Sequence, residues 1–243
     1  MTRDSSMLEI KIIYDNNSIR KGVKPAWGFS ALIQYKGNRL LFDTGGKTDV
    51  LLSNMKALHI SPKTVSGIFL SHNHWDHTGG LFGFLNQIHR AKVYIPVSFS
   101  QAYRYEIQSS GGECIRIKGF SKIAKDIYSS GELGKDIKEQ FVIIDTPKGL
   151  IMITGCSHPG IVAMAALAKE RLKKDILLIV GGFHLGEKNK KQISRLVKQL
   201  QALGVRSIAP CHCTGRTATG IFNKVFLNNC LEAGCGSQIT LAE

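Results

Sequence analysis

The order of predicted elements repeats in the two halves of the chain, and this repetition limits the fold more than any other feature. Each half predicts a β-hairpin, a glycine-containing loop, a helix, a short apolar strand and a histidine-containing loop. The same number of residues separates Gly45 from His72 and Gly155 from Gly182. Helices alternating with two hairpin units favour two sheets packed face to face with helices outside. We therefore expect an α/β (α+β) chain, a four-layer αββα sandwich of two mixed β-sheets flanked by helices.

The hydrophobic pattern places the individual elements. Apolar runs and alternation predict strands at 8–14, 29–35, 39–42, 68–70, 141–144, 150–154, 176–180, 207–209 and 239–241. Helical spacing of apolar residues predicts helices at 48–58, 81–88, 161–172 and 193–203. No linker interrupts the chain, so we expect a single domain over residues 1–243.

Segment 98–138 is the least regular part of the sequence. It is rich in lysine and glycine and shows no core pattern of its own. We expect it to be an insertion over one face of the domain, near the mouth of the active site. Its basic residues are then expected to recruit anions; among them are Arg104, Arg116, Lys118, Lys122 and Lys125.

Composition excludes several classes of protein. The 243 residues are 43% hydrophobic and 21% charged, which is ordinary globular usage and excludes a disordered or fibrous chain. No apolar run approaches the ~18 residues of a membrane span. The first residues lack the apolar core of a secretory signal, so we expect a cytoplasmic protein. The six cysteines are then expected to be thiols.

The net charge of +14 bears on the ligand. Such a surplus raises the local concentration of anions and favours phosphorylated ligands or nucleic acid. A lysine-rich, solvated surface explains the same number, and charge alone leaves both interpretations open.

Six of the eight histidines directly follow predicted strands. Loops at the same end of successive strands converge in space, so these side chains are expected to gather. In the segment 71–80, His72 and His74 are two residues apart in extended backbone and therefore point the same way. Asp76 and His77 follow at a turn and are directed toward a second position. Imidazole suits zinc, iron, copper or nickel, so the sequence predicts a metal site. The six histidines are His72, His74, His77, His158, His184 and His212.

The His-x-His-x-Asp-His pattern of residues 72–77 resembles the signature of the metallo-β-lactamase superfamily, and the resemblance extends over nearly the whole chain. Phe42-Asp43-Thr44-Gly45 is similar to another motif of that superfamily. Three further segments resemble the dihydropterin–ribofuranosylaminobenzene phosphate synthases, a subfamily that includes bacterial relatives with no assigned substrate. They are residues 155–160, 181–185 and 210–215.

The resemblance implies a site with two divalent transition-metal ions, zinc being expected and manganese or iron being alternatives. It implies that His72, His74 and His158 bind one ion. Asp76, His77 and His212 are the implied ligands of the other. His184 either replaces His212 or faces the substrate. Asp43 is the implied support of a metal-binding histidine.

The chain departs from the superfamily at Cys156, where a bridging aspartate is common. The thiol either coordinates a metal or is a small buried side chain, and we expect the second. The spacing of the remaining cysteines does not match an iron–sulfur pattern, so we expect inert thiols at Cys211, Cys213, Cys230 and Cys235.

Paired metal ions activate water for hydrolysis, with Asp76 as ligand and proton acceptor. The subfamily resemblance implies instead a condensation of a pterin diphosphate that displaces pyrophosphate. Both reactions suit a small anionic metabolite, phosphorylated or pterin-like, and this is the function we expect. One alternative is a nuclease or RNA-processing hydrolase acting on nucleic acid, although the chain lacks a stripe of aromatic residues for stacking bases. The other is a metal-binding module without catalysis.

Overall fold

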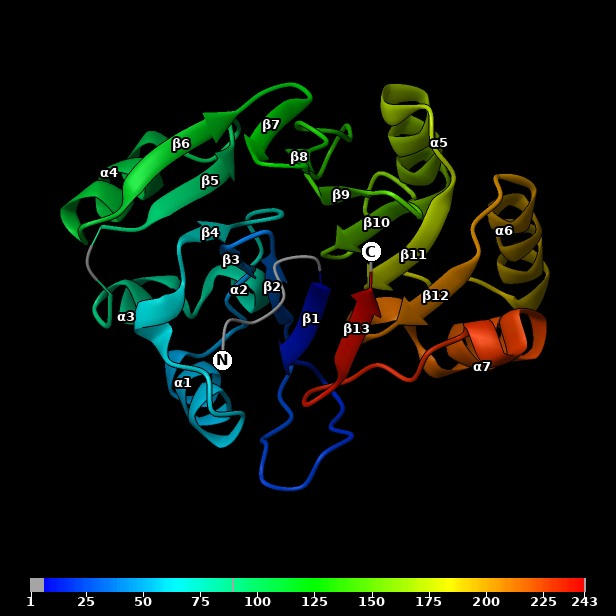
Figure 1. The fold of residues 1–243 in the computed structure, drawn as a ribbon, viewed down its shortest axis with the longest axis horizontal. Coiled ribbons are helices and arrows are strands. Elements are labelled where there is room, and N and C mark those ends of the chain that lie inside the picture. Colours follow the sequence, from blue (N-terminus) through cyan, green and yellow to red (C-terminus); the bar gives the residue numbers. More distant parts are fainter. Residues whose placement is uncertain (1–6, 89, 243) are drawn as a thin grey trace. The chain divides into compact units, whose positions relative to one another are not determined.

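The structure is a computed structural model that describes residues 7–88 and 90–242. They form two compact units, each with one β-sheet and its own helices (Figure 1). Unit 1 consists of the chain up to Lys118 together with the segment from Gly234, and unit 2 consists of Gly119–Ala233. The expected fold class, two mixed sheets flanked by helices, is confirmed.

Unit 1 contains a seven-stranded sheet in the order β13-β1-β2-β3-β4-β5-β6. Neighbours from β13 to β3 pair antiparallel, and neighbours from β3 to β6 pair parallel. The strands are β1 (Met7–Tyr14), β2 (Ser30–Tyr35), β3 (Asn38–Phe42), β4 (Gly67–Phe69), β5 (Lys92–Pro96), β6 (Glu113–Ile117) and β13 (Gln238–Ala242). Each parallel pair needs a crossover, and helices supply them: α1 (Thr48–Ala57), α2 (Trp75–Thr78), α3 (Leu81–Leu85) and α4 (Gln101–Ser109).

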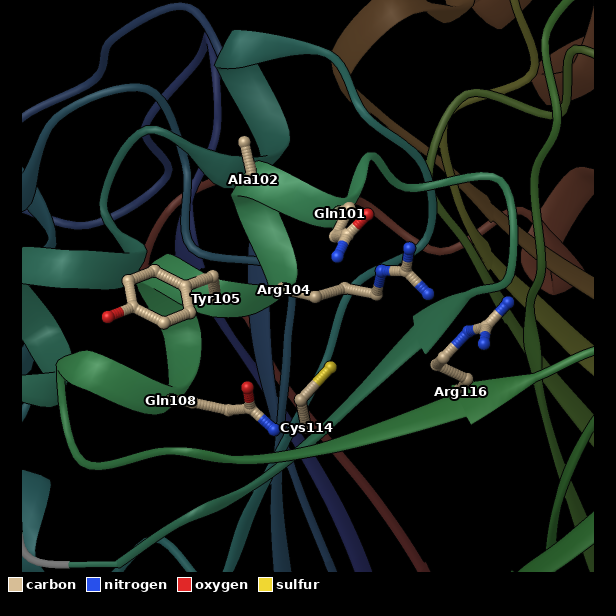
Figure 2. A pocket seen from close by; sticks show the side chains of 7 residues that line it. All are labelled: Gln101, Ala102, Arg104, Tyr105, Gln108, Cys114 and Arg116. Carbon is tan, nitrogen blue, oxygen red and sulfur yellow. The ribbon is translucent and has the colours of Figure 1, made fainter.

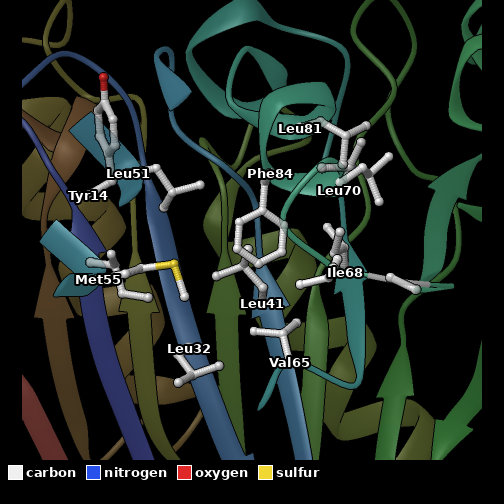
Figure 3. Packing of buried hydrophobic residues seen from close by; sticks show 14 of the residues in the cluster. Tyr14, Leu32, Leu41, Leu51, Met55, Val65, Ile68, Leu70, Leu81 and Phe84 are labelled. Atoms are coloured by element: carbon white, nitrogen blue, oxygen red, sulfur yellow. The ribbon is translucent and has the colours of Figure 1, made fainter. Parts of the chain in front are cut away.

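The core of unit 1 forms where these helices pack on one face of the sheet. Leu51 and Met55 lie one turn apart on α1 and pack with Phe84 of α3 (Figure 3). They meet strand residues such as Leu41 and Ile68. Truncating a buried side chain of this size, as in Phe84→Ala, costs about 3–5 kcal/mol of folding free energy.

Unit 2 contains a six-stranded sheet in the order β12-β11-β10-β9-β8-β7. Neighbours from β7 to β10 pair antiparallel, whereas β10, β11 and β12 are parallel. The strands are β7 (Ser121–Ala124), β8 (Ile127–Ser129), β9 (Val142–Thr146), β10 (Gly149–Thr154), β11 (Ile176–Gly181) and β12 (Ser207–Pro210). Three helices pack on one face through apolar residues at helical spacing: α5 (Ile161–Leu172), α6 (Lys190–Ala202) and α7 (Arg216–Phe226).

Segment 98–138, the least regular part of the sequence pattern, folds into regular elements. It contains α4 and β6 of unit 1 and β7 and β8 of unit 2. The strands are short, and β6 and β7 have few fully buried residues because each is an edge strand. Their hydrophobic alternation is therefore weak in the sequence.

Candidate functional site

The first group of candidate residues belongs to unit 1 and follows two neighbouring strands. β3 and β4 are parallel and adjacent, so the chain leaves both at the same edge of the sheet. Asp43 follows β3, and Ser71 and His72 follow β4. Asp43 adopts the left-handed backbone conformation, with φ of 52°. This conformation is uncommon for a non-glycine residue, although aspartate tolerates it better than most.

The buried carboxylate of Asp43 organises this edge. Its Oδ1 accepts a hydrogen bond from the Ser71 backbone N–H at 2.7 Å. Its Oδ2 accepts one from the Ser71 hydroxyl, also at 2.7 Å. The same Oδ2 lies 2.7 Å from Nδ1 of His77. Because a carboxylate only accepts, Nδ1 of His77 carries the proton and its Nε2 presents a lone pair.

Ser71 connects Asp43 to His72 and fixes the tautomer of His72 as well. The Ser71 Oγ lies 2.9 Å from Nδ1 of His72. The single hydroxyl proton is already donated to Asp43, so Oγ accepts from His72 Nδ1–H. Nε2 of His72 is therefore unprotonated and able to bind a cation. Asp43 thus sets the tautomer of two histidines, one directly and one through Ser71.

The remaining ligand candidates of unit 1 lie in the same cluster. Nε2 of His72 and Nδ1 of His74 approach to 3.0 Å, and the rings of His72 and His77 are 4.2 Å apart between centroids. Nε2 of His77 lies 3.8 Å from Oδ2 of Asp76. The structure therefore brings together the four residues of the His-x-His-x-Asp-His segment, with His72, Asp76 and His77 buried. Imidazole nitrogen and carboxylate oxygen are a donor set that suits zinc and similar ions.

The second group belongs to unit 2 and follows its three parallel strands. The chain leaves β10, β11 and β12 at one sheet edge and places His158, His184 and His212 in the loops there. The rings of His158 and His184 are 4.5 Å apart between centroids. His184 and His212 both have φ of 49°, and Ser157 has φ of 61°. Left-handed backbone at three such residues is costly and typical of functional loops.

Glu139 holds the loop that carries His158. Its buried carboxylate accepts three backbone hydrogen bonds, from Cys156 at 3.0 Å, Ser157 at 2.9 Å and His158 at 2.8 Å. Hydrogen bonds to a charged acceptor are stronger than those to a neutral one. The sequence offers no signal for this role, because Glu139 is remote from the loop along the chain and belongs to no motif.

Two further contacts connect the loops of unit 2. Thr214 accepts a hydrogen bond from the Phe183 backbone N–H at 3.2 Å, which ties the loop of His184 to that of His212. Gly182 lies where three loops meet. A Cβ at Gly182 would come within 2.5 Å of the Gly155 carbonyl oxygen and 2.6 Å of the Cys213 sulfur. Only glycine allows the backbones to approach so closely.

Cys213 has a different environment from the inert one expected. The ligand atoms of Cys156, His184 and Cys213 all lie within 4.8 Å of one another and could hold a metal ion. A hydrogen bond with the Cys156 side chain lowers the pKa of the Cys213 thiol to about 4, with His184 contributing. The hydrogen bond with Cys213 in turn raises the pKa of His184. These contacts favour the thiolate form of Cys213, and no motif in the sequence indicates this role.

Comparison with known proteins identifies the family. Residues 28–162 match the model of the metallo-beta-lactamase superfamily. The chain belongs to the metallo-β-lactamase superfamily. It is 32% identical to a 7,8-dihydropterin-6-methyl-4-(beta-D-ribofuranosyl)-aminobenzene-5'-phosphate synthase of Methanocaldococcus jannaschii, over 83% of this chain and 86% of that protein. An uncharacterised protein of the same organism is 30% identical over 95% of this chain and 99% of its own length.

A solved structure shows the same fold. Tm1679, described as a metal-dependent hydrolase of the beta-lactamase superfamily, aligns with a TM-score of 0.82 and 27% identity. The alignment covers 97% of this chain and all of that one. The resemblance seen in the sequence, to the superfamily and to the synthase-like subfamily, is confirmed. Superfamily membership implies an enzyme that binds divalent metal, and the donor set around His72 fits such an ion. Within the described residues, no helix has the length and hydropathy needed to cross a membrane.

Proposed function

We propose that this protein is a metal-dependent enzyme that acts on a small phosphorylated or pterin-like anion. One observation carries the proposal: Asp43 orients His77 directly and His72 through Ser71, so that both Nε2 atoms are lone-pair donors. Outer partners of this kind are typical of metal-binding histidines. A histidine-rich loop without a metal has no need of such fixed tautomers.

Six side chains are the proposed ligands of two divalent transition-metal ions. His72, His74 and His158 bind one ion, and Asp76, His77 and His212 bind the other. His184 is the alternative to His212 or a contact to the substrate. Zinc is the favoured metal, with manganese and iron as alternatives, because the nearby sulfur of Cys213 suits zinc better than manganese.

When bound, such ions act as Lewis acids on a phosphoryl or carbonyl oxygen and lower the pKa of water. The protein's own contribution is to fix its ligands and to manage protons. Asp76 has one carboxylate oxygen near His77. We propose that this carboxylate also accepts the proton released in the reaction. The net charge of +14 supports an anionic substrate by raising its local concentration.

The position of Trp75 favours a substrate with a planar ring. Trp75 lies between His74 and Asp76 in the sequence, and the residue is 61% exposed. Its ring packs against Gly46, which leaves no room for a side chain there. An exposed indole offers a flat apolar face on which an aromatic ring such as a pterin can stack.

Two reaction types are compatible with the proposal, and they differ in which substrates are needed for pyrophosphate to be released. The identity to the archaeal synthase favours condensation, in which the pterin diphosphate is joined to an aminobenzene ribose phosphate as pyrophosphate leaves. The likeness to Tm1679 favours hydrolysis by water. The test is to incubate zinc-loaded protein with a dihydropterin diphosphate, with and without the aminobenzene ribose phosphate, and to measure pyrophosphate. Release that needs both substrates shows condensation, and release from the diphosphate alone shows hydrolysis.

Two variants and one further substrate complete the test. His72→Ala should lose activity by about 100-fold or more together with bound zinc, because a direct ligand is removed. His59→Asn is the matched control: His59 is exposed, and asparagine tolerates its left-handed backbone. Cleavage of single-stranded RNA in place of the small substrates would establish the nuclease alternative. Bound zinc without turnover of any of these substrates would overturn the proposal in favour of a non-catalytic module.

A further inference from the structure

A separate cavity of unit 1 lies between α4 and the edge strand β6, outside the histidine cluster (Figure 2). Its volume of about 460 Å³ is in the range of small-molecule sites. Arg104 and Gln108 come from one face of α4, four residues apart. Cys114 and Arg116 come from one face of β6, two residues apart. The helical period of α4 and the two-residue period of β6 therefore direct these four side chains toward the same cavity.

Two positive charges enter this cavity. In Figure 2 the guanidinium groups of Arg104 and Arg116 extend into the same side of the cavity, with the amide of Gln101 beside Arg104. Among the residues that the structure describes, neither arginine forms an ion pair with a carboxylate. The Nε of Arg104 donates a hydrogen bond to the Ser100 carbonyl at 3.3 Å, which leaves the terminal nitrogens of the guanidinium group available.

Acidic side chains are absent from the described residues that line the cavity. Glu113 alternates with Cys114 along β6, so the two side chains lie on opposite faces of the strand. Glu106 belongs to α4 but is not among the residues that line the cavity. Two guanidinium groups therefore share a concave surface in which no anion of the described chain balances them.

We propose that this cavity is a binding site for a phosphate monoester, with Arg104 and Arg116 as the two charged donors. A phosphate monoester carries two negative charges near neutral pH, which equals the charge of the arginine pair. Guanidinium groups match phosphate oxygens with paired, charge-assisted hydrogen bonds. Gln101 and Gln108 add amide donors at the rim, and Tyr105 offers an apolar face to the organic part of the ester. The ligand is thus a small phosphorylated metabolite, and its site does not depend on metal.

The test uses the full chain after dialysis against a chelator, so that metal-bound phosphate does not contribute. Phenyl phosphate and benzoate are titrated by calorimetry into the wild type and into Arg104→Gln/Arg116→Gln. Phenyl phosphate should bind more tightly than the singly charged benzoate. The double variant should lose about tenfold or more in affinity for phenyl phosphate. Lys63→Gln/Lys92→Gln is the matched control, because it removes two exposed positive charges of unit 1 outside the cavity.

Cys114 reports where the ligand binds. It lines the cavity, whereas Cys230 lies in unit 2. Burial raises the pKa of the Cys114 thiol, so alkylation by iodoacetamide is followed at alkaline pH by peptide mass spectrometry. Phenyl phosphate should slow the labelling of Cys114 in the wild type and not in the arginine variant, while Cys230 labelling stays unchanged. Equal losses of affinity in both double variants, equal binding of benzoate, or no protection of Cys114 would each overturn the proposal. None of these results bears on the metal-dependent activity.

Discussion

The Oδ2 atom of Asp43 lies 2.7 Å from Nδ1 of His77 and accepts the Ser71 hydroxyl at the same distance. Because Ser71 in turn contacts His72, one buried carboxylate determines which nitrogen of two histidines is free to bind a cation. The arrangement depends on β3 and β4 being parallel neighbours, since each delivers its loop to the same sheet edge. A change at Asp43 should therefore alter the metal site without removing any ligand.

Asp43→Asn should weaken zinc binding by about 10- to 100-fold and lower activity by a similar factor. The amide keeps the size of the carboxylate but replaces one acceptor oxygen with a donor, so it cannot accept from the Ser71 backbone N–H at one position and from His77 and the Ser71 hydroxyl at the other. Zinc affinity measured against a competing chelator checks the result. Asp49→Asn is the control, because Asp49 is exposed on α1. Equal affinity in wild type and Asp43→Asn would contradict the role given to Asp43.

The local sequence pattern is sufficient to predict that the candidate ligands of unit 1 lie together. The His-x-His-x-Asp-His segment places its ligands close together in sequence, so strand periodicity and one turn are enough to group them. Asp43 could be expected only through the resemblance to a family, because its contact with His77 depends on the parallel pairing of β3 and β4. No periodic signal encodes which strands are neighbours.

Glu139 and Cys213 show why the rest could not be predicted. Glu139 acts through backbone N–H groups, which every residue has, so no residue type in the loop marks its partner. The spacing of the cysteines predicts an inert thiol at Cys213, because it matches no iron–sulfur pattern. The chain instead turns through a short 3-10 helix at His212–Thr214, which directs the Cys213 sulfur toward Cys156 and His184. The edge strands β6 and β7 were missed because exposed strands carry little hydrophobic pattern.

Glu139→Gln should destabilise the protein by about 2 kcal/mol or more, because three backbone donors converge on a carboxylate that the amide replaces only in part. The loss should appear as a lower midpoint of urea unfolding. Zinc affinity should fall as well, since the same hydrogen bonds hold the backbone of His158. Glu170→Gln, an exposed position on α5, should leave both quantities unchanged. Unchanged stability in Glu139→Gln would contradict the role given to the carboxylate of Glu139 in holding this loop.

Cys213 should make stability depend on pH. Its pKa is about 4 in the folded chain, against an ordinary value of 9.0. The folded state therefore loses its proton first, and the contribution of Cys213 to stability rises with pH between these values. His184 has a raised pKa in the folded chain. At pH values below its ordinary pKa of 6.5, His184 is protonated in both the folded and the unfolded state, so it does not change the dependence of stability on pH. From about pH 4.5 to about pH 6.5, the wild type should gain stability relative to Cys213→Ser by at most about 1.4 kcal/mol per pH unit.

Urea unfolding of chelator-treated protein at several pH values measures this difference. Cys230→Ser is the control, because burial raises the pKa of Cys230 to about 11 and its thiol stays protonated throughout the range. Thiolate absorbance gives an independent reading at pH 6: it should be lost in Cys213→Ser and kept in Cys230→Ser. A stability difference that is flat with pH would mean that Cys213 is an ordinary thiol.

Gly182→Ala should displace the unit 2 loops through steric clashes alone. The added methyl would lie 2.5 Å from the Gly155 carbonyl oxygen, and that atom is backbone, so it cannot rotate away. The same methyl would lie 2.6 Å from the Cys213 sulfur and 3.2 Å from Cδ2 of His212. Relieving these contacts must move the loops after β10 and β12 apart, at a cost of about 1–3 kcal/mol. Because His212 is a proposed ligand, zinc affinity should fall together with stability.

Gly186→Ala is the matched control, since nothing lies within 4 Å of a Cβ there and its backbone is unstrained. Thermal unfolding and zinc titration of the two variants separate close packing at Gly182 from a general effect of removing a loop glycine. If Gly186→Ala lost as much as Gly182→Ala, loop flexibility rather than the contact with Gly155 would be the cause.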